Sequence, residues 1–339
     1  MAGGGEGNQM LSVSLILAET SEISSPPSPF PPPPPPPPPL CCCCLHLSLG
    51  LLVTFFFFFL SFHFFGFFSS SSSFFFEVIM LAAVINGNVK KLAELIRQDP
   101  DFDVNLAVDG HGWTLLHHAC DEDNGYAVIP ILLAHPDIDV NAKNINETPF
   151  YYACCGRPSC VREMLKDSRV KVNEPNRDGE TPLWVAANYG FLDVIKWWVA
   201  SGREMNLGKP DDKTDAIGLA KDRGKTEVVS LLERFKEHPE ETRHAMRVEL
   251  GFLDELAAEM FAMMVFVSDG LLQFKATGVK AGAKRTRFFN IACQLPLELQ
   301  MVLCFRQVGS SKEIIQGKDT ERAFKSMTRS LLWSSYFTG

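Results

Sequence analysis

The sequence lacks the short motifs by which many enzymes are recognised. It contains no glycine-rich phosphate loop, no G-x-S-x-G and no H-E-x-x-H. Cys154, Cys155 and Cys160 lie close together, but no second Cys or His pair follows at zinc-site spacing. We therefore expect no catalytic residue, no cofactor and no metal ion. An enzyme of unknown type stays an alternative only for the C-terminal part of the chain.

An excess of positive charge is also missing. The 339 residues include 32 Lys and Arg against 40 Asp and Glu, which gives a formal net charge of −8 at pH 7. Proteins that bind nucleic acid through bulk electrostatics have the opposite balance. The expected partner is therefore another protein, and no nucleic-acid partner is expected.

The ten cysteines do not suggest a disulfide framework. Four of them form the run Cys41 to Cys44, and most of the others lie within apolar helical patterns. Reduced, buried cysteines of a cytosolic protein are distributed in this way. The sequence therefore predicts a cytoplasmic protein without disulfides.

Residues 24–76 consist largely of homopolymer runs, among them Pro31 to Pro39, Phe55 to Phe59 and Ser69 to Ser73. Pro, Ser, Leu and Phe have codons that can begin with two pyrimidines, so a pyrimidine-rich non-coding tract would translate into this alphabet. We interpret residues 1–77 as a low-complexity tract that is disordered or mistranslated.

A membrane anchor is the alternative interpretation. Residues 40–68 contain no Lys, Arg, Asp or Glu, and this run is longer than the roughly 20 residues that a membrane helix needs. No Lys or Arg precedes the run, whereas Lys90 and Lys91 follow it. If residues 40–68 span a membrane, the positive-inside rule places the rest of the chain in the cytosol.

One sequence pattern recurs four times in the middle of the chain. Its copies start 34, 33 and 33 residues apart, at Thr114, Thr148, Thr181 and Thr214. A second marker, an asparagine that usually follows a valine, keeps nearly the same period at Asn105, Asn141, Asn173 and Asn206. The period and the T-P-L-H-x-A core resemble the ankyrin repeat.

The resemblance covers about five repeats in residues 78–235. A helix pair expected around residues 83–96 forms the first repeat, and a polar capping repeat follows Thr214. The resemblance implies an all-α fold, in which helix-turn-helix units stack into a solenoid with projecting loops and a concave surface for protein recognition. In each unit, Thr and Pro open the first helix, and Gly190 ends one of these helices.

The resemblance also nominates partner-binding residues, because partners of ankyrin repeats meet the loop tips and the exposed side of each first helix. Trp113 stands at a loop tip, and His118, Tyr152 and Val185 share one expected outward position in three successive copies. Tyr and Trp are common anchors at interfaces. The alternative is that Trp113 folds back over its own loop and that Tyr152 packs on its neighbour. His117 is expected to tie loop backbone together.

Residues 236–333 are expected to form a small helical domain of unknown function, which docks on the last repeat. His238 and Pro239 begin a helix, and apolar residues at helical spacing follow from Leu253 to Met264. A last helix is expected over residues 320–332. Residues 295–303 resemble the opening of an F-box, so a substrate adaptor of a ubiquitin ligase is an alternative to an ordinary amphipathic helix. The main prediction is a non-catalytic scaffold or adaptor that binds a protein through its repeats.

Overall fold

The computed structural model describes residues 71–108, 110–207, 215–272 and 288–338. Within these ranges every regular element is a helix, as the all-α prediction requires. The candidate membrane span at residues 40–68 lies outside the described residues. Among the helices that are described, none is both long and apolar enough to cross a membrane.

The chain divides into two compact units, one made of residues 1–25 and 80–339 and the other of residues 26–79. Of the second unit, only residues 71–79 are described, and they are the beginning of helix α3 (Ser71–Ile85). This helix starts ahead of residue 78, so it crosses the expected boundary between the low-complexity tract and the repeats.

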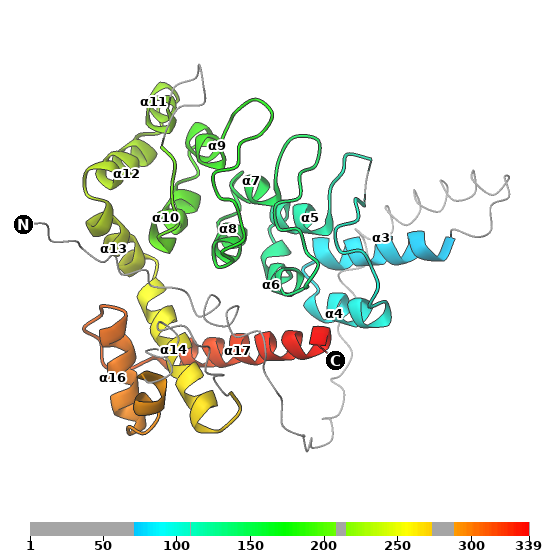
Figure 1. The fold of residues 1–339 in the computed structure, drawn as a ribbon. Coiled ribbons are helices and arrows are strands. Elements are labelled where there is room, and N and C mark those ends of the chain that lie inside the picture. Colours follow the sequence, from blue (N-terminus) through cyan, green and yellow to red (C-terminus); the bar gives the residue numbers. More distant parts are fainter. Residues whose placement is uncertain (1–70, 109, 208–214, 273–287, 339) are drawn as a thin grey trace, which may run out of the picture. The chain divides into compact units, whose positions relative to one another are not determined.

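Helices follow one another in pairs, each pair joined by a short turn and separated from the next by a longer loop (Figure 1). The first helices of the pairs are α3, α5 (Leu115–Asp121), α7 (Pro149–Ala153), α9 (Pro182–Tyr189) and α11 (Ala216–Asp222). The second helices are α4 (Val89–Gln98), α6 (Ile129–Leu133) with the preceding 3-10 turn η1 (Gly125–Ala127), α8 (Pro158–Leu165), α10 (Leu192–Ser201) and α12 (Thr226–Glu237). From α5 to α12, first helices contact first helices and second helices contact second helices, which produces a stacked array.

The helix ends follow the predicted chemistry. The Thr148 and Thr181 side chains accept hydrogen bonds from backbone N–H groups three residues later, and a proline follows each as the first helical residue. Gly190 ends α9 with φ 80°, a left-handed conformation that glycine adopts without steric cost. These predictions are confirmed.

Small alanines and large aromatic rings are both found in the core of the array. Ala153, Ala186 and Ala187 have no exposed surface, so neighbouring helices can approach closely. Trp198 is also fully buried and meets the edge of Phe150, with ring centroids 5.2 Å apart. Trp198 is therefore a core residue of the array.

The C-terminal helices form a core of their own. They are α13 (Pro239–Glu249), α14 (Phe252–Ser268), a helical stretch at residues 288–292, α16 (Leu297–Gln307) and α17 (Gly317–Thr338). Helix α14 packs against both α16 and α17. Phe261, Met264 and Phe305 are buried between these helices. We call α13 to α17 the C-terminal module.

The C-terminal module contacts the last repeat, as expected, and it also reaches earlier repeats. Helix α13 lies against α10 and α12, and Arg247 donates to the Ala200 carbonyl oxygen at 2.7 Å. Glu255 of α14 pairs with Arg162 of α8, and α17 reaches α6. Sequence periodicity identifies helices but not the neighbours of their exposed faces, so this extended contact was not predictable.

Candidate functional site

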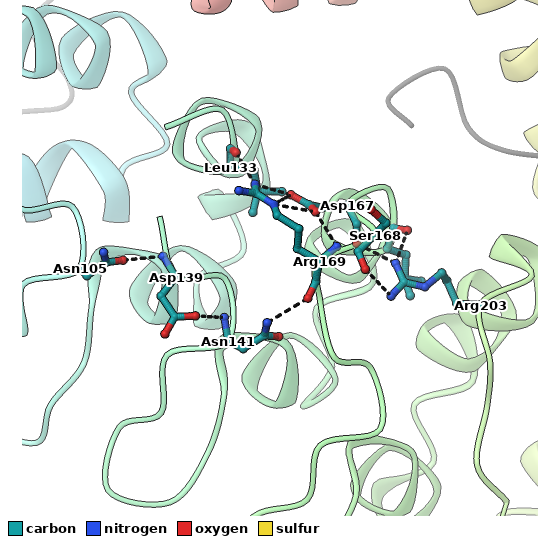
Figure 2. A network of polar contacts seen from close by, with 9 residues as sticks. Asn105, Leu133, Asp139, Asn141, Asp167, Ser168, Arg169 and Arg203 are labelled. Carbon is teal, nitrogen blue, oxygen red and sulfur yellow. Dashed lines mark hydrogen bonds and ion pairs between the residues drawn. The ribbon is translucent and has the colours of Figure 1, made fainter. Parts of the chain in front are cut away.

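A series of asparagines joins the first four repeats in succession, and Figure 2 shows two of them, Asn105 and Asn141. The Asn141 side chain donates to the Arg169 carbonyl oxygen at 2.9 Å and accepts from the Lys171 N–H at 2.7 Å. Asn105 and Asn173 bridge their own successor repeats in the same way. We call these three residues the asparagine ladder. The ladder explains why the second sequence marker keeps the repeat period.

Arginine side chains add a second set of bonds between repeats (Figure 2). Arg203 donates to the carbonyl oxygens of Asp167 at 2.7 Å and Val170 at 2.6 Å, just beyond the end of α8. Arg169 likewise donates to the Leu133 carbonyl oxygen at 2.7 Å, at the end of α6. A cation suits this position because carbonyl groups at a helix C-terminus lack intrahelical donors.

The ladder fixes the base of the loops that precede the first helices, which we call fingers. Two fingers are described over their whole length, at residues 141–147 and 173–180. In the first, the Asn144 side-chain oxygen accepts from the N–H groups of Asn146 at 2.9 Å and Glu147 at 2.8 Å. Asn176 closes the second finger with equivalent bonds. Each finger therefore has a defined shape before any partner binds.

Each finger also holds a tyrosine of helix α7. The Asn144 amide donates to the Tyr152 hydroxyl oxygen at 2.8 Å, and this hydroxyl donates to the Glu147 carboxylate at 3.0 Å. Burial, together with Glu147, raises the pKa of Tyr152 to about 12. Tyr151 is held in the same manner by the second finger, where Asn176 donates to its hydroxyl oxygen at 3.1 Å. Each tyrosine ring is therefore held at one end by the backbone of α7 and at the other end by the hydrogen bonds of its hydroxyl group.

Trp113, His117, His118 and Tyr152 form one group of rings, which we call the aromatic cluster. Trp113 is half-buried, and its ring centroid lies 4.4 Å from that of Tyr152 and 5.1 Å from that of His118. His117 packs edge-on with Tyr152, with ring centroids 5.9 Å apart. The cluster thus joins a loop tip to two successive first helices.

His117 has the predicted structural role. Its Nδ1 accepts from the Thr114 N–H at 3.1 Å, and its Nε2 lies 3.2 Å from the Glu147 carbonyl oxygen in the next finger. Since Nδ1 accepts, Nε2 carries the proton and donates to Glu147. The imidazole therefore connects two loops, as expected.

Three of the four nominated residues come together in the structure, and the fourth does not. Trp113, His118 and Tyr152 belong to the aromatic cluster and are half-buried. Val185 is only 6% exposed, so the outward direction expected for it is wrong. A tyrosine at the equivalent position must bring its hydroxyl to polar partners, whereas valine has no polar group and is drawn into the core.

Exposed apolar residues of the array were missed, and Ile145 and Tyr189 have the largest exposed fractions among them. Ile145 is 61% exposed in the first finger, and Tyr189 is 60% exposed at the end of α9, where it stacks on Phe191 with centroids 5.7 Å apart. Ile145 stands alone between two asparagines in a loop, which is a signal that the sequence offered. Tyr189 offered none, because an aromatic residue near a helix end is commonly part of a core.

Neither the array nor the rest of the described residues has a cluster of three or more His, Cys, Asp or Glu placed to hold a metal ion. Cys120, Cys154 and Cys160 are free and fully buried. Burial raises the pKa of the Cys160 thiol to about 12 and raises those of Cys120 and Cys154 as well. These three thiols therefore act as apolar core residues.

Comparison with known proteins agrees with the repeat pattern. Residues 128–209 match the family model described as ankyrin repeats. A human SMC5-SMC6 complex localization factor protein 1 is 32% identical over 156 residues, which cover 41% of this chain and 14% of that protein. Alpha-latrocrustotoxin-Lt1a of Latrodectus tredecimguttatus is 31% identical over 98 residues, covering 29% of this chain and 7% of the toxin.

A putative ankyrin repeat protein of Acanthamoeba polyphaga mimivirus is 28% identical over 108 residues, which cover 28% of this chain and 11% of the viral protein. The chain thus spans less than a fifth of the length of the curated relatives that it matches. The period, the stacked helix pairs and the matched model agree. The chain therefore contains ankyrin repeats, which the family model places in residues 128–209.

Proposed function

We propose that the chain is a non-catalytic scaffold whose protein partner binds across the fingers and the first helices, with the aromatic cluster at the centre of the interface. Ankyrin repeats imply protein partners in general. The finer assignment to this face depends on one observation, the aromatic cluster that the first finger holds in place.

Preorganisation makes the cluster suitable as an interface anchor. Trp and Tyr bury a large area and have few torsions to freeze, so they contribute strongly when their orientation is already set. The Tyr152 hydroxyl has two partners in the finger, and its ring lies against Trp113. The exposed side chain of Ile145 extends an apolar contact surface onto the same finger.

The position of the C-terminal module favours the same face. Its extensive contacts with the array involve second helices, with α13 against α10 and α12 and α17 against α6. Trp197 of α10 also packs edge-on with Phe252 of α14, with ring centroids 6.0 Å apart. The Arg162 guanidinium carbon lies over the Trp197 ring, 5.1 Å from its centroid. The chain itself therefore occupies much of the second-helix side, which favours the first-helix side and the fingers for a partner.

Affinity capture with the full chain tests this proposal. Wild-type protein, Trp113→Ala and the control Asn290→Ala are immobilised, and the proteins that each retains are quantified by mass spectrometry. Asn290 is exposed and lies in the C-terminal module, away from the fingers. At least one protein should bind the wild type and the control but be depleted on Trp113→Ala. Equal retention by a Trp113→Ala protein that still melts like the wild type would refute the proposed interface.

A ubiquitin-ligase adaptor is the second candidate, and one observation favours it. Leu297 and Leu299, in the segment that resembles an F-box opening, are 54% and 52% exposed in the first turn of α16. Exposed leucines at a helix start are available to a partner. In the same capture experiment, this candidate requires a ligase scaffold subunit that is lost in the Leu297→Ser, Leu299→Ser double variant. Its absence from the wild-type sample would remove the candidate.

We also propose that the protein works in the cytosol, where its buried thiols stay reduced. Cys120, Cys154 and Cys160 pack in the core of the array as free cysteines. Cell fractionation should recover the full chain with cytosolic proteins. Recovery with membranes after an alkaline wash would instead support an anchor at residues 40–68.

A further inference from the structure

A polar groove of about 820 Å³ lies between the second-helix side of the array and α17. Tyr126 of η1 and Pro130 of α6 form part of one wall, together with Arg162 of α8 and Lys166 directly after this helix. The other wall consists of side chains from α14 and α17. Tyr126 is 45% exposed, so the groove combines an accessible aromatic ring with charged walls.

Helix α17 contributes a basic stripe to this groove, formed by Lys318, Arg322, Lys325 and Arg329. Their spacings of four, three and four residues put them on one face of the helix, and all four are exposed and line the groove. Lys325 pairs with Glu321 at 2.6 Å. The structure records no ion pair for the other three within the described residues.

The acidic residues of the groove are mostly engaged or weakened as anions. Glu255 pairs with Arg162, and Glu163 lies 3.0 Å from the Lys166 ammonium group. Burial raises the pKa of the Glu259 carboxyl group, which favours its neutral form. Asp319 lies in the first turn of α17, where the helix dipole partly offsets a negative charge. The unpaired cations therefore set the electrostatic character of the groove.

We propose that this groove binds an acidic peptide segment of a partner protein, aligned along α17. The stripe from Lys318 to Arg329 extends about 16 Å at the rise of an α-helix, which matches about five residues of extended chain. Carboxylates of the peptide pair with Lys318, Arg322 and Arg329, and an apolar peptide residue lies against Tyr126. The site is separate from the fingers and does not depend on the function proposed for them.

Local charge complementarity supports this partner. The whole chain has a formal net charge of −8, so an acidic peptide would be repelled by most of the protein surface. The row of unpaired cations gives this groove a positive local potential, unlike most of the protein surface. Its dimensions suit a single extended chain, which separates it from a flat basic patch.

Fluorescence anisotropy with a labelled peptide of six glutamates, flanked by glycines and containing one central leucine, tests the proposal on the full chain. The wild type should bind, and the Arg322→Gln, Arg329→Gln double variant should bind at least about fivefold more weakly at low salt. The difference should shrink when the salt concentration is raised to about 0.5 M, because exposed charges are screened.

The charge-matched control is Arg223→Gln combined with Lys236→Gln, two exposed cations of α11's end and α12 outside the groove. It should change peptide affinity by less than about twofold, and Ile145→Ser should also leave the affinity unchanged. Thermal melting shows that each variant is folded. Equal losses in the two double variants, or no loss in the α17 variant, would overturn the proposal. Tighter binding of an oligonucleotide or of anionic lipid vesicles than of the peptide would also overturn it.

Discussion

Arg203 is expected to contribute more to stability than an ordinary surface arginine, because its guanidinium group serves several carbonyl oxygens of the preceding repeat. Two bonds are short, to Val170 at 2.6 Å and to Asp167 at 2.7 Å, and the bonds to Leu165 and Ser168 are longer, at 3.5 Å. Hydrogen bonds to charged groups contribute about 1.5–3 kcal/mol each, and partial exposure reduces these two to about 1–1.5 kcal/mol each. Their joint contribution is therefore about 2–3 kcal/mol.

Substitution at Arg203 tests this magnitude. Arg203→Met keeps an aliphatic stem but removes the donors, so urea unfolding followed by circular dichroism should show a loss of about 2–3 kcal/mol. Arg203→Lys keeps the charge but not the fork-shaped donor geometry, so it should recover about half of that loss. The matched control Arg223→Met removes an exposed guanidinium group and should change stability by less than about 0.5 kcal/mol.

Two outcomes would refute the reasoning. If Arg203→Met is as stable as the wild type, the bonds to the preceding repeat contribute nothing net. If Arg203→Met and Arg223→Met lose the same free energy, the loss comes from a general property of arginine and not from the carbonyl contacts.

Three further perturbations have defined outcomes. Ala186→Glu places a carboxylate where no surface is exposed, so it should cost several kcal/mol and lower the melting temperature of the array; an unchanged transition would contradict the assigned register. Asn141→Ala should cost about 1–2 kcal/mol in urea unfolding through two lost ladder bonds, and equal losses for it and for the exposed Asn290→Ala would count against the ladder. Burial raises the pKa of Cys155 to about 11, so its alkylation rate should rise about tenfold per pH unit from pH 8 to 10, and a flat rate would disprove the shift.

The repeated elements of the fold could be predicted because their causes are local. Thr148 and Thr181 cap helices through their own side chains, and Gly190 ends α9 through its own backbone conformation. The role of His117 was also predictable, because its partners occur at fixed positions of the repeat. Each of these features depends on residues that recur with the sequence period.

The features that were not predicted depend on contacts between distant segments. Val185 is buried, although its position in the repeat is the same as that of the half-buried Tyr152, because side-chain chemistry decides which of them keeps a surface position. The contact of α14 with α8 rests on Glu255 and Arg162, which no period connects. The basic stripe of α17 was readable as a helical pattern, but only the structure shows that it lines a groove.

Two exposed isoleucines offer the most direct comparison of the two candidate interfaces. Ile145 is 61% exposed in the first finger, and Ile291 is 56% exposed in the C-terminal module, so both can be changed to serine at little cost to stability. The measurement is the dissociation constant of the captured partner for the full-length wild type, Ile145→Ser and Ile291→Ser, by isothermal titration calorimetry. If the fingers bind the partner, Ile145→Ser weakens binding by about fivefold or more and Ile291→Ser changes it by less than about twofold. The reverse order, with affinity lost only in Ile291→Ser, would contradict a binding face on the fingers and first helices.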